Sequence, residues 1–439
     1  MKPIAFDIQS AGCDAAVLAE YNQQLQPEIA RITAARGAGY TTDYASINLP
    51  DDEQMLVRVL ELVAEKKVFE PSVLVVIGIG GSSLGTRAVH EALNGMYYNE
   101  QFPDIKFYCV ETVDSDNVWD VLLLVEQALE MQERVLVNVI SKSGSTTETI
   151  ANYELCVALL KNYWDEAYRD YVIITTDEDS KLWHLGQKDN ITCLPIPKHV
   201  GGRYSVFSAV GLFPLAMLGV DIRALCAGAR DMVARCCDTT LENNPAALSA
   251  AIIAYHYRQN KNIHDTFLFS VDLEGVGRWY RQLMGESIGK ERNRAGDVVH
   301  VGMTPTVSIG STDLHSVGQL YLGGPHDKFT TFITVEHMKS DCVVPVLPQF
   351  ESLVANIQGR SLVSIMEAIV HGVQKAYRTQ QVPFVTITIP EKSSSYIGQL
   401  LQCKMLEMMY LGFLLEVNPF DQPHVENYKQ ETRKILAHE

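Results

Sequence analysis

A hydroxyl-rich stretch over residues 141–147 has the residue types and spacing to bind a phosphate group. It holds five serine or threonine side chains together with Lys142 and Gly144, and the pattern predicts that a buried strand precedes it and a helix follows it. Unpaired N–H groups and the positive end of the helix dipole favour an anion at such a turn. Capping the N-terminus of a helix needs only one hydroxyl side chain, and this turn has five. The turn also lacks the Gly-Lys-Ser/Thr sequence with which a P-loop ends. We therefore expect a phosphate site without a P-loop.

A glycine-rich turn, Gly-Ile-Gly-Gly-Ser-Ser-Leu-Gly, follows an earlier predicted strand at residues 78–85. It lacks the third glycine of a dinucleotide fingerprint, although Glu111 stands where a ribose-binding acid would be expected. Close packing between helix and strand explains the glycines equally well. Gly81 and Ser82 are alternatively placed to lend a backbone N–H and a hydroxyl to a sugar.

Four ionisable residues could carry chemistry, but the residues alone leave each of them open. Arg203 follows Gly201-Gly202 and is either solvated or presented to a developing negative charge. Glu286 stands four residues before Lys290, so the two could form an ordinary ion pair on a surface helix that stops at Gly289. His315 and Lys429 are single residues of types that are usually structural or solvated.

These residues must be positioned by strands that alternate with helices. Apolar runs at residues 73–79, 105–110, 135–140 and 171–175 are spaced for intervening helices, and runs at 266–271, 330–335 and 384–389 form a second series. We predict an α/β fold with two mainly parallel sheets, joined near residues 224–244. The predicted organisation is an N-terminal segment (1–45), a first domain (46–225), a second domain (226–392) and a helical C-terminal tail (393–439), whose last helix begins near Pro423.

Composition narrows the class of protein. The chain has 439 residues, which favours two domains. A formal net charge of −17 argues against a nucleic-acid partner. No apolar run is long enough to cross a bilayer and no signal peptide is evident, so no membrane partner is expected. Nine cysteines without a Cys-x-x-Cys pair indicate thiols in a reducing compartment, hence the cytoplasm.

Six segments taken in order give the chain a resemblance to a known family. GIGGSSLG, SKSGSTTET, GGRYSVFSAVGLFPLA, QLMGESIGKE, STDLHSVGQL and NPFDQPHVENYK together resemble the glucose-6-phosphate isomerases, in their shorter bacterial form, over residues 78–429. Each segment alone is weak, whereas six in this order are specific. The resemblance implies two sugar-isomerase α/β/α domains with mainly parallel sheets and a helical tail. It also implies a homodimer whose site lies between the domains and near the subunit interface.

The resemblance also implies roles for individual residues. Glu286 would be the base that moves a proton between C1 and C2, and Arg203 would steady the enediolate. His315, donated by the partner subunit, and Lys429 would open the sugar ring, and Glu148 would orient its neighbours. The substrate-binding set would be Gly81, Ser82, Ser141, Lys142, Ser143, Thr146, Gly202, Gln282 and Gln422.

The implied reaction is the reversible interconversion of D-glucose 6-phosphate and D-fructose 6-phosphate. A carboxylate that reaches both carbons can pass the proton through a cis-enediol. A guanidinium can stabilise the charge that grows on the oxygens. The reaction is internally redox neutral, so we expect no cofactor and no metal, with a sugar phosphate as the small-molecule partner. The sequence departs from the family pattern at His424 and Ser145, and neither change removes a catalytic group.

Other interpretations are weaker. A metal-dependent isomerase would need clustered ligands, and the twelve histidines show no His-x-His or His-x-x-x-His pattern. An amino-sugar phosphate isomerase would keep the phosphate turn but not Arg203, Glu286, His315 and Lys429 in these settings. A dehydrogenase would need the absent dinucleotide fingerprint. A non-catalytic sugar-phosphate sensor is the serious alternative, and it would have no need of Glu286.

Overall fold

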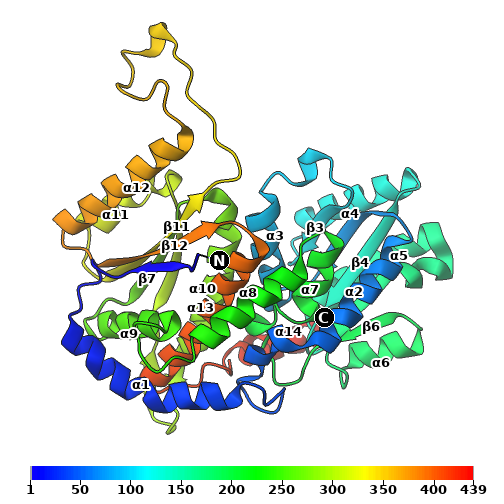
Figure 1. Ribbon diagram of the computed structural model, residues 1–439. Coiled ribbons are helices and arrows are strands. Elements are labelled where there is room, and N and C mark those ends of the chain that lie inside the picture. Colours follow the sequence, from blue (N-terminus) through cyan, green and yellow to red (C-terminus); the bar gives the residue numbers. More distant parts are fainter. Residues whose placement is uncertain (1, 439) are drawn as a thin grey trace.

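A computed structural model describes residues 2–438 and shows two five-stranded sheets side by side (Figure 1). The first sheet is parallel throughout, in the order β3-β2-β4-β5-β6. Its strands are β2 (Pro71–Ile77), β3 (Lys106–Val110), β4 (Arg134–Ile140), β5 (Val172–Thr176) and β6 (Thr192–Pro195). The four strands predicted for the first half are confirmed, and β6 is an addition.

Helices cover both faces of the first sheet because its strands are apolar on both sides. Leu74, Val76 and Leu136 belong to the core on one face, and Val73 and Val75 belong to the core on the other. The helices on the first face are α2 (Glu53–Lys67), α3 (Leu84–Asn94) and α7 (Ala209–Met217). Those on the second face are α4 (Ser115–Glu130), α5 (Thr147–Trp164) and α6 (Lys181–Lys188). The first half is therefore a closed three-layer unit.

The second sheet has the order β1-β12-β11-β7-β10, and only β1 runs antiparallel. Its strands are β1 (Ala5–Asp7), β7 (Ile263–Leu268), β10 (Thr304–Ile309), β11 (Lys328–His337) and β12 (Phe384–Glu391). One face packs on α10 (Glu274–Ile288) and α13 (Ser394–Leu414), and the other faces α11 (Gly318–Gly323) and α12 (Leu362–Thr379). Two mainly parallel α/β units are thus confirmed, and the N-terminal segment supplies an edge strand to the second.

Helix α13 fills the middle of the molecule, and nearly every one of its side chains is buried. It packs against α8 (Ile222–Arg235), α9 (Pro245–Arg258) and α1 (Ala15–Ala35). Glycines let α8 and α13 touch backbone to backbone, because a Cβ added at Gly228 would lie 1.9 Å from the Ser395 carbonyl oxygen. Helix α13, which lies in the predicted tail, is therefore part of the core. The first part of the predicted joining segment, residues 224–244, belongs to helix α8. The domain boundaries themselves stay a prediction.

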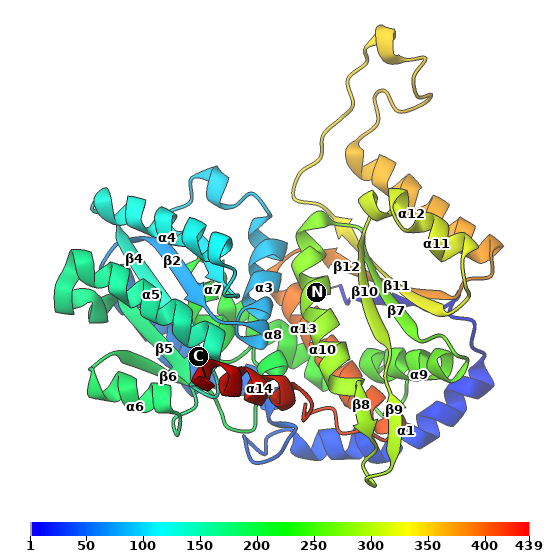
Figure 2. The same cartoon turned by 180° about the vertical axis from the view of Figure 1, so that it is seen from behind.

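Two peripheral features complete the chain. Residues 338–361 form an arm that projects from the second half before α12 (Figures 1 and 2). The hairpin β8 (Lys290–Arg292) and β9 (Val298–Val301) follows α10, and the last helix, α14 (Val425–His438), runs from there toward the first half. Among the described residues, no helix is long and apolar enough to cross a membrane.

Candidate active site

The hydroxyl-rich turn and the glycine-rich turn lie together at the carboxyl edge of the first sheet. The first follows β4 and the second follows β2, and these strands are neighbours. From β2 the chain passes to β3 on one side, and after β4 it continues to β5 on the other. Such a topological switch point opens a crevice at the carboxyl ends of the strands, where ligands bind in open α/β sheets.

The hydroxyl-rich turn is held in shape by its own hydrogen bonds. Ser141 Oγ and Thr146 Oγ1 are 2.9 Å apart, and Thr176 Oγ1 donates to the Ser141 carbonyl over 2.5 Å. Gly144 has a φ of +63°, and a Cβ there would lie 2.7 Å from Ser180 Cβ. Ser143 is exposed above the start of α5. The structure therefore brings Ser141, Ser143 and Thr146 together, as the sequence predicts.

Lys142 ties this turn to the chain that precedes Arg203. Its Nζ donates to the carbonyl oxygens of Lys198 (2.7 Å) and Val200 (2.8 Å), which leaves one N–H for an anion. Burial lowers the pKa of this lysine. Glu148 lies half-buried in the first turn of α5, and no hydrogen bond or ion pair joins its side chain to another described residue.

The glycine-rich turn makes a close contact with the turn that carries Arg203. A Cβ added at Gly81 would lie 2.2 Å from the carbonyl carbon of Gly202, so the two backbones touch. Gly80 has a φ of +60°, and a Cβ there would lie 2.9 Å from Gln282 Nε2 on α10. Ser82 ends the short 3-10 turn Gly80–Ser82. Gly81 thus permits a close backbone contact within the first half, and Gly80 permits an approach to α10 of the second half, both of which a side chain would block.

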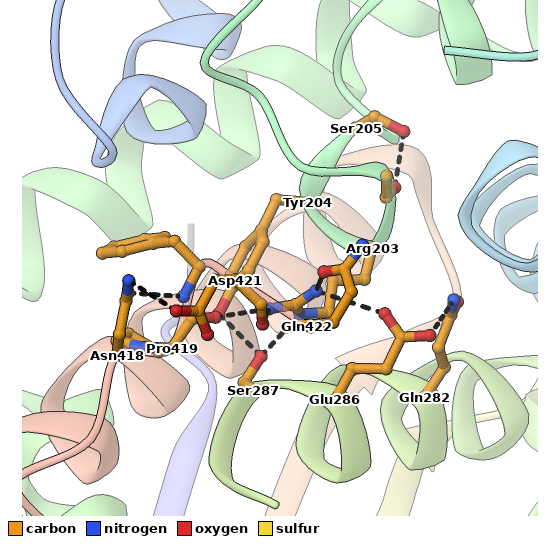
Figure 3. A network of polar contacts seen from close by, with 12 residues as sticks. Arg203, Tyr204, Ser205, Gln282, Glu286, Ser287, Asn418, Pro419, Asp421 and Gln422 are labelled. Atoms are coloured by element: carbon orange, nitrogen blue, oxygen red, sulfur yellow. Dashed lines mark hydrogen bonds and ion pairs between the residues drawn. The ribbon is translucent and has the colours of Figure 1, made fainter. Parts of the chain in front are cut away.

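Arg203 is buried at the centre of a polar network that joins three distant segments (Figure 3). Its Nε donates to Ser287 Oγ over 2.8 Å, and its Nη1 contacts Glu286 Oε2 at 3.2 Å and also donates to Gln422 Oε1. Its Nη2 donates to the carbonyl oxygens of Pro419 (2.6 Å) and Asp421 (3.1 Å). All five N–H groups of the guanidinium therefore have partners.

Glu286 presents a carboxylate that is partnered on both oxygens yet accessible. Oε2 faces Arg203, and Oε1 accepts from Gln282 Nε2 over 2.9 Å, one helical turn earlier on α10. The side chain is 31% exposed. The alternative of a surface pair between Glu286 and Lys290 is wrong, because the Lys290 ammonium is buried and donates to the Glu286 carbonyl oxygen.

Several members of this network carry no signal in the sequence. Tyr204 Oη lies 2.9 Å from Ser287 Oγ, and Lys290 Nζ contacts Asp421 Oδ1 at 2.8 Å. Backbone carbonyls at residues 419 and 421 accept from Arg203 more than 200 positions away in the chain. Sequence spacing cannot reveal such contacts, because only the folded chain brings these segments together.

The network does not include Lys429 or His424. Lys429 lies in the first turns of α14, where its Nζ is 2.8 Å from Glu426 Oε1 and its side chain is 36% exposed. His424 Nε2 lies 3.0 Å from Glu291 Oε2, close to the start of β8. The structure thus gives His424 an ion-pair partner, and it leaves Lys429 without a bond to Arg203 or Glu286.

His315 lies at the opposite end of the second sheet from Glu286. Two glycines of α10 show how this helix lies along β10. Gly277, near the start of α10, lies against Val307 and Leu268, and Gly285, near its end, lies close to Pro305 at the beginning of β10. Helix α10 therefore runs back along β10 and ends beside its beginning, whereas His315 follows its end. The six-residue strand is about 20 Å long. Exposed His315 does not meet Glu286 within one chain.

The assembled side chains favour proton transfer next to an anion. They offer a hydroxyl-rich turn suited to an anion, an accessible carboxylate and a fixed guanidinium. Among the described residues, no group of three or more His, Cys, Asp or Glu side chains could hold a metal ion.

Comparison with known proteins shows what the chain is similar to. Residues 65–439 match the model of the family described as phosphoglucose isomerase. A glucose-6-phosphate isomerase of Carboxydothermus hydrogenoformans is 36% identical over 397 residues, which cover 89% of this chain and 84% of that protein.

Solved structures agree with this result. A hypothetical protein from Thermus thermophilus superposes with a TM-score of 0.87 at 30% identity, covering 99% of this chain and all of that one. A glucose-6-phosphate isomerase from Chlamydia trachomatis has the same fold, with a TM-score of 0.83 at 21% identity over 99% of this chain and 88% of that one.

Proposed function

The chain belongs to the phosphoglucose isomerase family, and from this premise we propose that the side chains around Glu286 carry the family's reaction. That reaction is the reversible interconversion of D-glucose 6-phosphate and D-fructose 6-phosphate. The observation that carries the proposal is the Glu286 carboxylate held between Arg203 and Gln282, at the end of the crevice that begins with the phosphate turn.

Glu286 acts as the base that takes the proton from one carbon and returns it to the next. A single carboxylate can serve C1 and C2 because the two carbons are adjacent in the open-chain sugar. The bond to Gln282 fixes Oε1, and the contact with Arg203 fixes Oε2. A cis-enediol is the intermediate.

Arg203 stabilises the negative charge that develops on the sugar oxygens. Because all five of its N–H groups are already used, a sugar oxygen must replace one of the present acceptors. The two acceptors at Nη1, Glu286 and Gln422, are the candidates, since they are side chains that can turn away, whereas Nη2 binds two backbone carbonyls and the Nε bond to Ser287 is buried. Exchange of the Gln422 bond would bring that side chain onto the substrate.

The turn after β4 holds the substrate phosphate, with Ser141, Lys142, Ser143 and Thr146 as donors. Gly81, Ser82 and Gly202 line the space between this turn and α10, and Glu148 orients the turn from the first turn of α5. Binding energy from the remote phosphate then serves to position the reacting carbons.

Ring opening is assigned to His315 and Lys429, with His315 donated by a second copy of the chain. The exposed position of His315 beyond the carboxyl end of β10 supports an origin in the partner. A homodimer is further supported by the arm, which exposes Val343, Val346, Phe350 and Leu353, and by α12, in which only Tyr377 is fully buried. Apolar surface of this extent is typical of an interface. Variants with serine at Val346, Phe350 and Leu353 should then sediment as monomers, and an unchanged dimer would remove the arm from the interface.

The enzyme needs no cofactor because the reaction is internally redox neutral, and we infer that it needs no metal. All nine cysteines are free thiols and five are buried, which supports work in a reducing compartment such as the cytoplasm.

A coupled assay tests the function. Purified protein with fructose 6-phosphate and a chelator should form glucose 6-phosphate, reported by glucose-6-phosphate dehydrogenase. Turnover that disappears on chelation would contradict the metal-free reaction. Absence of turnover, with sugar-phosphate binding still seen by calorimetry, would favour a sensor and make Glu286 a structural carboxylate.

A further inference from the structure

Lys290 joins the end of α10 to the segment that carries Gln422. It is the first residue of β8, directly after Gly289, where α10 ends. Its side chain is only 6% exposed, although an ammonium normally stays in water. A lysine is buried in this way when specific acceptors replace its hydration.

The acceptors of Lys290 come from both sides of the site. Nζ donates to the carbonyl oxygen of Glu286 over 2.9 Å, to Asp421 Oδ1 over 2.8 Å and to the Asp421 carbonyl oxygen. Burial lowers the pKa of Lys290, and the hydrogen bond to Asp421 opposes that shift. One cation therefore links the residue that presents the base to the residue before Gln422.

The crossing segment, residues 417–422, is packed in its first part, where Val417 and Pro419 are buried and Tyr204 Oη donates to the Pro419 carbonyl oxygen over 3.3 Å, whereas Asp421 and Gln422 are exposed. Arg294 Nε donates to the Val417 carbonyl over 2.9 Å, and Phe420 packs edge-on against Tyr44 with ring centroids 4.9 Å apart. Beyond it, the side chains of α14 are mostly exposed, so the helix contributes little anchoring of its own. The second end of the segment depends on Arg203 and Lys290.

We propose that Lys290 is a positioning residue for the isomerase reaction, acting through Asp421 and the Glu286 backbone. This inference rests on the proposed role of Glu286. Arg203 must exchange a bond when substrate arrives, and a segment held by Arg203 alone would then loosen. Lys290 supplies a second cation, and this one does not bind the substrate. It therefore keeps residues 417–422 against α10 while Arg203 exchanges one of its hydrogen bonds.

The test compares Lys290→Met with Lys328→Met. Lys328 is a matched control because it is also buried, donates to a backbone carbonyl (Pro325, 3.1 Å) and pairs with a neighbouring aspartate. Lys290→Met should lower kcat about tenfold or more with KM and inhibition by inorganic phosphate nearly unchanged, because the phosphate turn is untouched. Lys290→Arg should recover most of the loss. Lys328→Met should leave kcat within about twofold.

Hydrogen–deuterium exchange provides a readout that does not depend on turnover. Lys290→Met should speed exchange in residues 417–424, and Lys328→Met should not. Failure of the wild-type enzyme to isomerise would defeat the proposed function and leave this exchange result standing. If Lys290→Met is poorly folded, Asp421→Asn removes the ion pair at a 52% exposed side chain and should lower kcat in the same direction. Unchanged kcat and exchange in these variants, or an equal loss in Lys328→Met, would overturn the inference.

Discussion

The two halves of the molecule are built alike but turn opposite edges of their sheets toward the candidate site. The first half offers the carboxyl edge of its sheet, where the turns after β2 and β4 meet. The second half offers the end of α10, which lies beside the amino end of β10. Its own carboxyl edge, where α11 follows β10 and the arm follows β11, lies at the other end of the sheet (Figures 1 and 2), and His315 stands directly after β10. One copy thus holds two candidate functional edges that do not meet in the same site.

This difference explains why a dimer would be useful. Carboxyl edges of parallel sheets collect loops and functional residues. In the second half that edge is occupied by a histidine with no described partner in its own chain. In a dimer with twofold symmetry, the histidine of each copy would serve the site of the other copy. The comparison makes separate predictions for each edge.

The largest effect is expected from the end of α10. Glu286→Gln removes the proton acceptor while keeping its shape, so kcat should fall about 10³-fold with little change in KM. Steady-state kinetics measures both values. Glu274→Gln, the same change in the first turn of α10, is the control and should be nearly silent. Substantial residual turnover in Glu286→Gln would contradict the base assignment.

The carboxyl edge of the second half should give the next largest effect. His315→Ala should lower kcat about 10²-fold, because it removes one member of the ring-opening pair. The exposed His337 is a control at the end of β11, and His337→Ala should retain normal kcat. Equal activity of His315→Ala and the wild type would leave the second carboxyl edge without a role.

The carboxyl edge of the first half should affect binding rather than chemistry. Lys142→Met should raise KM about tenfold and leave kcat nearly unchanged, because the phosphate interaction is made equally in ground state and transition state. Lys198→Met is a matched control, since that side chain is 73% exposed and pairs only with Asp179. A fall in kcat at constant KM would move Lys142 from the phosphate to the reacting carbons.

The last effect concerns stability rather than activity, and stability should depend on pH similarly in both halves. Burial lowers the pKa of His90 in the first half and of His256 in the second to about 4. Both histidines fold in the neutral form, so their contribution is complete above pH 6.5 and is lost as pH falls toward 4. Each should cost about 2 kcal/mol of unfolding free energy between pH 7 and 5. Urea unfolding measures this, and His256→Gln should show a shallower decline than the wild type; an equal slope would contradict it.

The parts predicted from sequence share a local origin. Strand β4, the turn at residues 141–147 and α5 are contiguous, so hydrophobic pattern and turn chemistry were sufficient to predict this strand, turn and helix, and with them a phosphate site that stays a prediction. The Arg203 network was beyond such reasoning, because its three segments are joined only by the fold. Residue types left Arg203 and Glu286 undecided, and the family resemblance alone singled them out. Lys290 entered only as a possible i,i+4 partner of Glu286, because such pairs are common on helices, and here the helix ends before it.

Mixed dimers would show whether the second half of each copy serves two sites, one in its own copy and one in its partner. Glu286→Gln and His315→Ala subunits, each nearly inactive alone, are unfolded together and refolded as a mixture. Random assortment makes half of the dimers mixed, with one intact site each, so activity should return to about a quarter of the wild-type value. No recovery, with mixed dimers verified by mass spectrometry, would mean that His315 and Glu286 act within one chain or not together at all.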